Sequence, residues 1–337
     1  MAASGGYWLN LAEAQKLTQT TLVPGVIEEN IRRGGILASL PLVQVIGKSL
    51  TWNKEDTERE GREVAPGDQL TWTDNIKYTQ KEVELKIVYD QTPLDHFVES
   101  TYGNINNYEA ITLRGLRKGL LRRLEDRFVY ADLTYGINEF DGLHAIGEEG
   151  AAALGVDENG ALSIANMRSV QDEMKLGIDF WLMPFEIARR IDAFYQEAGS
   201  VTSGRSIVGS YWWDKNEMGM RIPVWNGVPI VRSDYLVAED DGTGVGSNRR
   251  AKYTSGTKTY SIFAVKMGQI RELEGGISLA FGGERHDLGE FFKTVYFPNL
   301  ENYDAAGLRL VAYASLAAGS KYAVGRIFDI TDAAVTE

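Results

Sequence analysis

The stretch from Asn107 to Ala131 constrains the fold of this chain more than any other. Large apolar side chains recur in it at three- and four-residue steps, at Leu113, Leu116, Leu120, Leu124 and Phe128. That spacing predicts an α-helix with one apolar face, and about 23 residues in a helix make a rod of roughly 35 Å. On this stretch alone two interpretations remain open: a long surface helix, or a spine that other layers of the fold cross.

Glycine and basic residues add two expectations for this helix. Gly115 and Gly119 lie four residues apart, and each costs about 1 kcal/mol relative to alanine. Together they leave a flat strip where another backbone can approach closely. Five basic side chains fall mostly on the other faces of the helix: Arg114, Arg117, Lys118, Arg122 and Arg123.

Composition limits the classes of function. The chain has 337 residues, of which 44% are hydrophobic, so it can bury a sizeable core in about two domains. A formal net charge of −12 repels nucleic-acid phosphates overall, although local basic patches can still bind them. There is no cysteine, which excludes disulfides and thiol chemistry. No apolar run approaches the roughly 20 residues of a membrane span, and we expect a soluble protein made in the cytoplasm without a signal peptide.

The first half of the chain predicts segments that need a neighbour. Residues 1–35 predict an arm with short helices, in which Tyr7 and Trp8 require burial that another subunit would supply. Apolar and β-branched residues at 36–52 predict a strand or a strand-turn-strand. Next, Asn53 to Glu63 is almost entirely charged.

Beyond this charged run, apolar and polar residues alternate at Leu70–Tyr78 and at Glu82–Tyr89, which predicts a long two-stranded excursion with a polar tip. A solvated loop is the alternative interpretation. Because a lone hairpin is only marginally stable in water, the excursion is expected to lie on its own domain or on a neighbouring molecule.

The rest of the chain mixes helices and strands without a regular alternation, which is typical of the α+β class. An amphipathic helix is predicted at Ser163–Met174, and a buried strand at Asp179–Met183 precedes a helix that Pro184 opens. Asn226-Gly227 predicts a two-residue hairpin turn between strands at 222–225 and 228–232. Further strands are predicted at 259–267, 277–281, 291–297, 308–316 and 323–330.

In their order and spacing, these parts resemble the major capsid proteins of tailed bacteriophages, the family with the HK97 fold. The local signals are Phe140-Asp141-Gly142-Leu143 after the long helix, Asp179-Phe180-Trp181-Leu182-Met183, and Trp225-Asn226-Gly227-Val228-Pro229-Ile230 followed by Ser233-Asp234. The resemblance implies an α+β, HK97-like fold with an N-terminal arm, an extended β-hairpin loop, a peripheral domain with a long spine helix, and an axial domain with a central sheet flanked by helices. These are expected at 1–35 for the arm, 51–86 for the loop, 36–50, 87–139 and 309–337 for the peripheral domain, and 140–308 for the axial domain.

The resemblance implies a structural subunit rather than an enzyme. Such a subunit self-assembles into an icosahedral phage head around double-stranded DNA, which it encloses without reading its sequence. The implied partners are other copies of the chain in hexamers and pentamers, together with separate scaffolding, portal and decoration proteins, and no membrane. The implied location is the virion capsid, assembled in the host cytoplasm. Because the arm begins almost at Met1, no scaffolding segment is expected ahead of it, and no lysine–asparagine pair for a crosslink is identified.

We expect the contacts between subunits to involve the arm, the loop and the basic face of the helix, whose cations would meet acidic groups on neighbouring loops. The expected interface residues are Tyr7, Trp8, Lys54, Glu58, Arg59, Arg62, Trp72, Arg114, Arg117, Lys118, Arg122 and Arg123. Within the same fold, the alternative is the shell of an encapsulin-type nanocompartment. From another class, the alternative is a hydrolase or sugar-binding protein that uses Trp212, Trp213 and nearby carboxylates in a cleft.

The sequence contains no motif for a catalytic, cofactor or metal site. His96, His144 and His286 lie far apart, and we expect them at partly buried or surface positions. Neither a P-loop nor a nucleophile elbow is present. Asp240-Asp241-Gly242 lacks the alternating ligands and the closing glutamate of a calcium loop.

Overall fold

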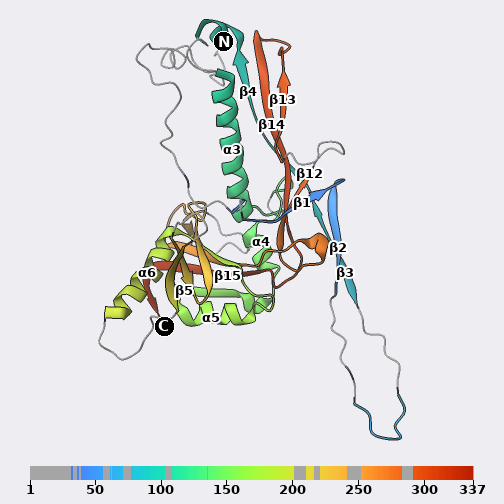
Figure 1. The fold of residues 1–337 in the computed structure, drawn as a ribbon, viewed down its shortest axis with the longest axis vertical. Helices are drawn as coiled ribbons and strands as arrows, with labels where there is room; N and C mark the ends of the chain where they lie inside the picture. The colour runs from blue at the N-terminus through green and yellow to red at the C-terminus, as the bar shows by residue number, and fades with distance from the viewer. Residues whose placement is uncertain are drawn as a thin grey trace.

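The computed structural model describes residues 32, 36–37, 39–55, 61, 63–70, 77–102, 108–134, 136–200, 210–215, 221–240, 252–282 and 291–336. Within them the strands form a five-stranded sheet, an eight-stranded sheet and a two-stranded hairpin. Figure 1 shows that the five-stranded sheet and the long helix α3 form an elongated peripheral domain, and that the eight-stranded sheet lies below it in a rounder axial domain. Among the described residues, no helix combines the length and the apolar character that crossing a bilayer requires.

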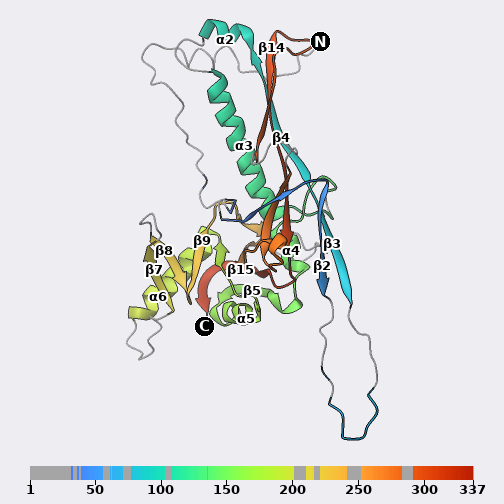
Figure 2. The same cartoon turned by 45° about the vertical axis from the view of Figure 1, so that its right-hand side comes forward.

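The long helix predicted from the sequence is confirmed as α3 (Tyr108–Tyr130). Leu116, Leu120, Leu124 and Phe128 are buried on one face, as their spacing predicted, and Leu113 is partly buried beside them. This face packs on the peripheral sheet, where α3 runs alongside β4 (Lys86–Asp95) and β14 (Ala305–Ala318) (Figures 1 and 2). The helix is therefore a spine that lies along the sheet on one face, while its other faces stay at the surface.

The expectation that another backbone approaches the strip of two glycines is wrong. A Cβ atom added at Gly119 would lie 3.1 Å from the side-chain oxygen Oδ2 of Asp90 on β4, with no backbone atom of another element within 4 Å. A Cβ atom at Gly115 would meet nothing within 4 Å.

The peripheral sheet is built from strands that are distant in the sequence. Its order is β1 (Leu42–Val45), β12 (Ile277–Gly282), β14 and β13 (Lys293–Phe297), with β4 paired to β14. β1 and β12 are parallel, whereas β14 is antiparallel to β12, β13 and β4. The short helix α2 (His96–Tyr102) follows β4 at the end of the domain that lies far from the axial sheet (Figure 2).

The axial sheet has the order β5, β15, β11, β6, β9, β8 and β7, and β10 pairs with β11. These strands are β5 (Gly155–Ser163), β6 (Phe180–Met183), β7 (Tyr211–Lys215), β8 (Arg221–Trp225), β9 (Val228–Arg232), β10 (Glu239–Asp240), β11 (Lys258–Val265) and β15 (Val324–Thr336). Short 3-10 turns occur at Ala152–Leu154 and Ile270–Glu272.

Helices cover the axial sheet, which explains why its central strands are apolar on both faces. All four residues of β6 are buried. The predicted helices are confirmed as α5 (Ile164–Glu173) and α6 (Phe185–Ser200), which pack with the sheet in one apolar core, and α4 (Leu143–Glu148) contacts β15. The predicted Asn226-Gly227 turn is also confirmed, with φ of 47° and 85° at its two residues.

Sheet membership corrects the expected division of the second half of the chain. β12 and β13 lie within 140–308, yet both belong to the peripheral sheet. Conversely, β15 lies within 309–337 but pairs with β11 and β5 in the axial sheet. Alternating residues indicate that a segment is a strand, but pairing depends on contacts between distant parts of the chain, which a single segment does not encode.

The extended loop begins as a hairpin of β2 (Ser49–Glu55) and β3 (Tyr78–Glu84), paired from Ser49 opposite Glu84 to Glu55 opposite Tyr78. Its strands are not the predicted pair, since the alternating stretch 82–89 is shared between β3 and β4. The partner of β3 is β2, which begins in the region 36–52 that predicted a strand or a strand-turn-strand. Its alternation of apolar and polar residues was hidden by the charged residues at its end. Both views show the hairpin directed away from the two domains (Figures 1 and 2).

Candidate assembly surfaces and domain junction

No residue of the hairpin strands is fully buried, although alternate residues of β2, among them Trp52, are half-buried. Tyr78 is 68% exposed at the start of β3, and Leu70 is 75% exposed in the loop beyond it. Lys54 lies half-buried on β2, opposite Thr79. The base of the hairpin is tied to the axial domain by an ion pair between Lys81 and Glu149, at the end of α4. The outer part is thus presented to solvent on a ribbon anchored at its base.

The five basic residues of α3 remain near solvent. Arg114, Arg117 and Arg123 are exposed, and Lys118 and Arg122 are partly covered. Arg114, Lys118 and Arg122 are spaced by four residues and therefore share a face. Partial desolvation and the neighbouring Arg122 lower the pKa of Lys118 from its usual value. The sequence thus concentrates positive charge on one side of the spine.

The structure does not bring all the expected interface residues together. Lys54 is on the hairpin, whereas the basic residues are on the spine helix, far from it in the same molecule (Figure 1). The remaining expected residues, Tyr7, Trp8, Glu58, Arg59, Arg62 and Trp72, lie outside the described residues.

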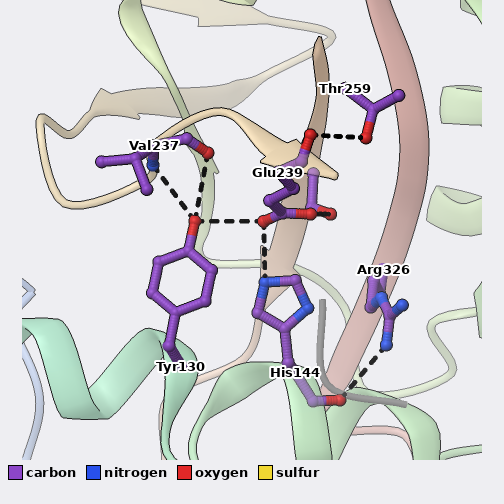
Figure 3. A network of polar contacts seen from close by, with 7 residues as sticks. Tyr130, His144, Val237, Glu239, Thr259 and Arg326 are labelled. Atoms are coloured by element: carbon purple, nitrogen blue, oxygen red, sulfur yellow. Dashed lines mark hydrogen bonds and ion pairs between the residues drawn. The ribbon is translucent and has the colours of Figure 1, made fainter. Parts of the chain in front are cut away.

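A buried polar cluster at the end of the spine helix was not expected from the sequence. Glu239 on β10 is 0% exposed and accepts a hydrogen bond from Ser261 Oγ at 2.7 Å. Tyr130, the last residue of α3, donates to it across 3.1 Å. Nε2 of His144 on α4 lies 3.0 Å from the same carboxylate (Figure 3). One carboxylate therefore joins four elements of secondary structure.

Electrostatics explain how this carboxylate is held. Burial by itself raises the pKa of Glu239, but His144, Ser261 and Tyr130 together lower it below its ordinary value. Burial, together with the nearby Glu239, raises the pKa of Tyr130 well above its usual value, so the phenol keeps its proton and can donate it. The cluster therefore stabilises an ionised Glu239 in the core.

Aromatic rings enclose the His144 side chain. Its ring is stacked on that of Tyr130, with centroids 5.1 Å apart, and meets the edge of Phe263 at 4.9 Å. His144 is 1% exposed, so the expectation of a partly buried or surface position is wrong for this histidine. His96 is partly exposed, and His286 lies outside the described residues.

A second buried carboxylate, Glu125 on α3, anchors the start of the described chain. Its two oxygens accept hydrogen bonds from the backbone N–H groups of Ile36 (2.8 Å) and Leu37 (3.0 Å). Burial raises the pKa of Glu125, and these two hydrogen bonds lower it only in part. A signal was present in the sequence, since Glu125 interrupts the apolar face of the helix between Leu124 and Phe128.

The two tryptophans of the alternative hydrolase or sugar-binding interpretation lie at the edge of the axial sheet. Trp212 and Trp213 are 42% and 40% exposed on β7, an edge strand of the axial sheet, and Arg232 covers the ring of Trp213 at 5.2 Å. A hollow of about 680 Å³ lies on the peripheral sheet, between β4 and the Phe297–Arg309 region. Within the described ranges, no three side chains of metal-binding type lie together.

No family model matches the sequence, and no curated protein matches it. Solved structures do match. The SrpI encapsulin of Synechococcus elongatus PCC 7942 is 15% identical, with 98% of this chain and 99% of that chain covered and a TM-score of 0.68. The capsid of a native GTA particle is 13% identical over 95% and 100% of the two chains, with a TM-score of 0.55. The capsid of cyanophage P-SCSP1u is 11% identical over 94% of both chains, with a TM-score of 0.54.

The chain has the HK97-like capsid fold. The α+β architecture expected from the sequence is thereby confirmed, because these matches extend over nearly all of this chain and of each solved chain. In the HK97-like fold, α3 corresponds to the spine helix and the β2–β3 hairpin to the base of the extended loop.

Proposed function

We propose that this protein is a structural subunit that self-assembles into an icosahedral phage head enclosing double-stranded DNA. The observation that carries the proposal is the β2–β3 hairpin, which stands away from both domains and, among the described residues, pairs with no third strand. A two-stranded ribbon is only marginally stable in water, so it needs a surface to lie on. A second copy of the chain would supply that surface.

A second exposed surface lies on a different part of the molecule. On the peripheral sheet, Tyr313 is opposite Ile87, and these side chains are 37% and 63% exposed. Tyr89, on the same face, is 61% exposed. When two different patches of one subunit meet, the contacts run head to tail, and they form rings where the rotation between subunits closes. Rings of five and six subunits are the units from which an icosahedral shell is built.

The work of such a subunit is association rather than catalysis. Standard interfaces bury about 1,600 Å² in total, and several modest contacts acting together hold a subunit firmly. The acidic net charge of −12 suits a container whose inner face should not grip packaged DNA everywhere. The proposed location is the virion capsid, assembled in the host cytoplasm, with scaffolding, portal and decoration proteins as separate partners.

Electron microscopy of the purified full chain tests the shell. We expect closed particles of uniform size, together with a mass by light scattering that corresponds to many subunits. A stable monomer at all concentrations, with no particles, would contradict the proposal.

The encapsulin-type compartment remains the second candidate, and one observation favours it: the encapsulin match has a TM-score of 0.68 and nearly complete coverage of both chains. The contents of particles isolated from the source cells discriminate between the two. Nuclease-protected double-stranded DNA supports the phage head, whereas particles that hold a folded protein cargo and no DNA support the compartment.

A further inference from the structure

The buried cluster around Glu239 occupies the place where the spine helix meets the axial domain. Tyr130 ends α3, His144 lies in α4, Glu239 begins β10 and Ser261 lies in β11. Figure 3 shows the side chains of Tyr130 and His144 converging on the Glu239 carboxylate from one side of the cluster. Within the apolar core that the two domains share at this place, one carboxylate that water does not reach joins the helix end to the axial sheet.

The hydroxyl group of Tyr130, at the end of α3, has two possible hydrogen-bond acceptors. Its hydroxyl lies 3.1 Å from the Glu239 carboxylate and 3.2 Å from the carbonyl oxygen of Val237, and it accepts a hydrogen bond from the N–H of Val237 at 3.1 Å. Because a phenol has a single hydrogen, it donates to only one of these two oxygens at a time.

We propose that Glu239 is a proton-responsive joint, which holds the spine helix to the axial sheet when it is ionised and releases the helix end when it is protonated. An ionised carboxylate only accepts hydrogen bonds, and three donors converge on this one. A protonated carboxyl group carries a hydrogen of its own and loses its charge. Its attraction for the three donors is weaker, and its own hydrogen needs an acceptor among them, so the Tyr130 hydrogen is then free to turn to Val237.

Charged groups on every side of the joint fit this assignment. From α3, Asp126 forms an ion pair with Lys252, whose Nζ also lies 5.1 Å from the centre of the Tyr130 ring. From α4, His144 can donate through Nε2 either as a neutral tautomer or as an imidazolium. From β15, Arg326 donates to the backbone oxygen of His144 at 3.4 Å. β11 contributes the neutral hydroxyl groups of Ser261 and Thr259.

The direction of the response follows from the pKa of Glu239, which lies below its ordinary value of 4.5. The stabilisation by the ionised form is complete above that ordinary value, and it is lost as the pH falls through the lowered pKa. The joint is thus engaged at neutral pH and opens only in acid. Since α3 extends roughly 35 Å from the joint, a small displacement at Tyr130 becomes a large one at the far end of the helix.

Distances between two spin labels test the proposal directly. The chain has no cysteine, so Glu109→Cys on α3 and Asp172→Cys on α5 give one label in each domain, both at exposed positions. Labelled protein is diluted into an excess of unlabelled full-length protein and measured by pulsed electron resonance between pH 7.5 and pH 3. We expect one narrow distance distribution at neutral pH, and a second or broader one in acid while the far-UV circular dichroism remains native.

Three variants distinguish the protonation of Glu239 from other effects of low pH on the protein. Glu239→Gln carries no charge at any pH and is expected to show the broad distribution throughout. Ser261→Ala removes one donor, so its transition should move to higher pH. The control Asp179→Asn removes another partly buried carboxylate, which binds Lys266 at 2.8 Å, and should keep the wild-type transition.

Three results would overturn the proposal. The wild-type distances could remain constant until the circular dichroism signal is lost. Glu239→Gln could respond to pH as the wild type does. If Glu239→Gln fails to fold, Ser261→Ala decides, and an unchanged midpoint in that variant would show that Glu239 is not the responding group.

Discussion

At Gly142 the chain passes so close to the end of α3 that a side chain has no room. An added Cβ atom would lie 2.8 Å from the carbonyl oxygens of both Arg127 and Phe128, and 3.0 Å from the backbone nitrogen of Ala131. The N–H of Gly142 donates to the carbonyl oxygen of Ala131 at 2.8 Å. This glycine lets α4 begin directly against the spine helix, and it thereby brings His144 to the polar cluster.

Replacing this residue by Gly142→Ala should destabilise the protein by about 2–3 kcal/mol, because the new methyl group overlaps backbone atoms that cannot move independently. Chemical denaturation measures the change. Gly115→Ala is the matched control, since its site is open and alanine favours a helix by about 1 kcal/mol. The changes in the free energy of unfolding should therefore have opposite signs in the two variants. Equal free energies of unfolding for the two variants would show that α4 can shift without cost.

Two buried glutamates show how residue environment sets the response to pH. The pKa of Glu125 is raised by burial, so its contribution to stability is present below its ordinary pKa and is lost as the pH rises through the raised value. Glu239 behaves in the opposite way, because its donors outweigh its burial. Two glutamates near the C-terminal end of α3, one in the helix and one in contact with it, thus change stability with pH in opposite directions.

Removal of the Glu125 carboxylate tests whether it anchors the chain at Ile36 and Leu37. Glu125→Ala leaves the N–H groups of Ile36 and Leu37 without their acceptors, which costs about 1–3 kcal/mol for each buried donor. We expect hydrogen–deuterium exchange at these two amides to become roughly fivefold to a hundredfold faster, since 1.4 kcal/mol corresponds to a factor of ten. Glu109→Ala, at the exposed start of α3, should leave both amides unchanged, and equal protection in the two variants would refute the anchor.

At the scale of elements, the spine helix combines two separate surfaces. One face packs into the peripheral core through Leu116, Leu120 and Leu124. The other faces present a concentration of basic side chains, of which Arg114 and Arg117 are exposed. Exposed charges contribute little to the stability of a single subunit, so their effect is expected in contacts between subunits.

Charge reversal on this surface tests its role in assembly. The double variant Arg114→Glu and Arg117→Glu should prevent particle formation, as seen by electron microscopy and light scattering, because repulsion replaces attraction to acidic loops. Its far-UV circular dichroism should remain native. The control pair Arg221→Glu and Arg271→Glu makes the same change in net charge at exposed positions outside α3 and should still assemble. Normal particles from the α3 variant would show that the basic face of α3 takes no part in the contacts between subunits.

At the scale of the whole molecule, two kinds of surface are separated in space. The hairpin points away from the body, while the exposed face around Tyr89 and Tyr313 lies on the peripheral sheet. The subunit buries its apolar cores, whereas the β2–β3 hairpin and the aromatic face around Tyr89 and Tyr313 remain exposed to solvent. Such a distribution is expected of a repeating unit in a larger assembly.

The sequence by itself determined the elements whose signals are local. Apolar spacing predicted α3, Pro184 marked the start of α6, and Asn226-Gly227 predicted the hairpin turn, because each depends on residues within a few positions of one another. The order of these elements was sufficient for the HK97-like fold to be expected.

Only the tertiary structure decided which strands pair and which polar groups meet. β15 joined the axial sheet, β2 proved to be the partner of β3, and Glu239 met Tyr130 and His144 across a separation of about 100 residues. A buried carboxylate is stable only where its donors are brought together, and those donors come from segments that have no local relation to it. The physical reason is that burial and pairing are properties of the packed chain, whereas propensity and periodicity are properties of each segment.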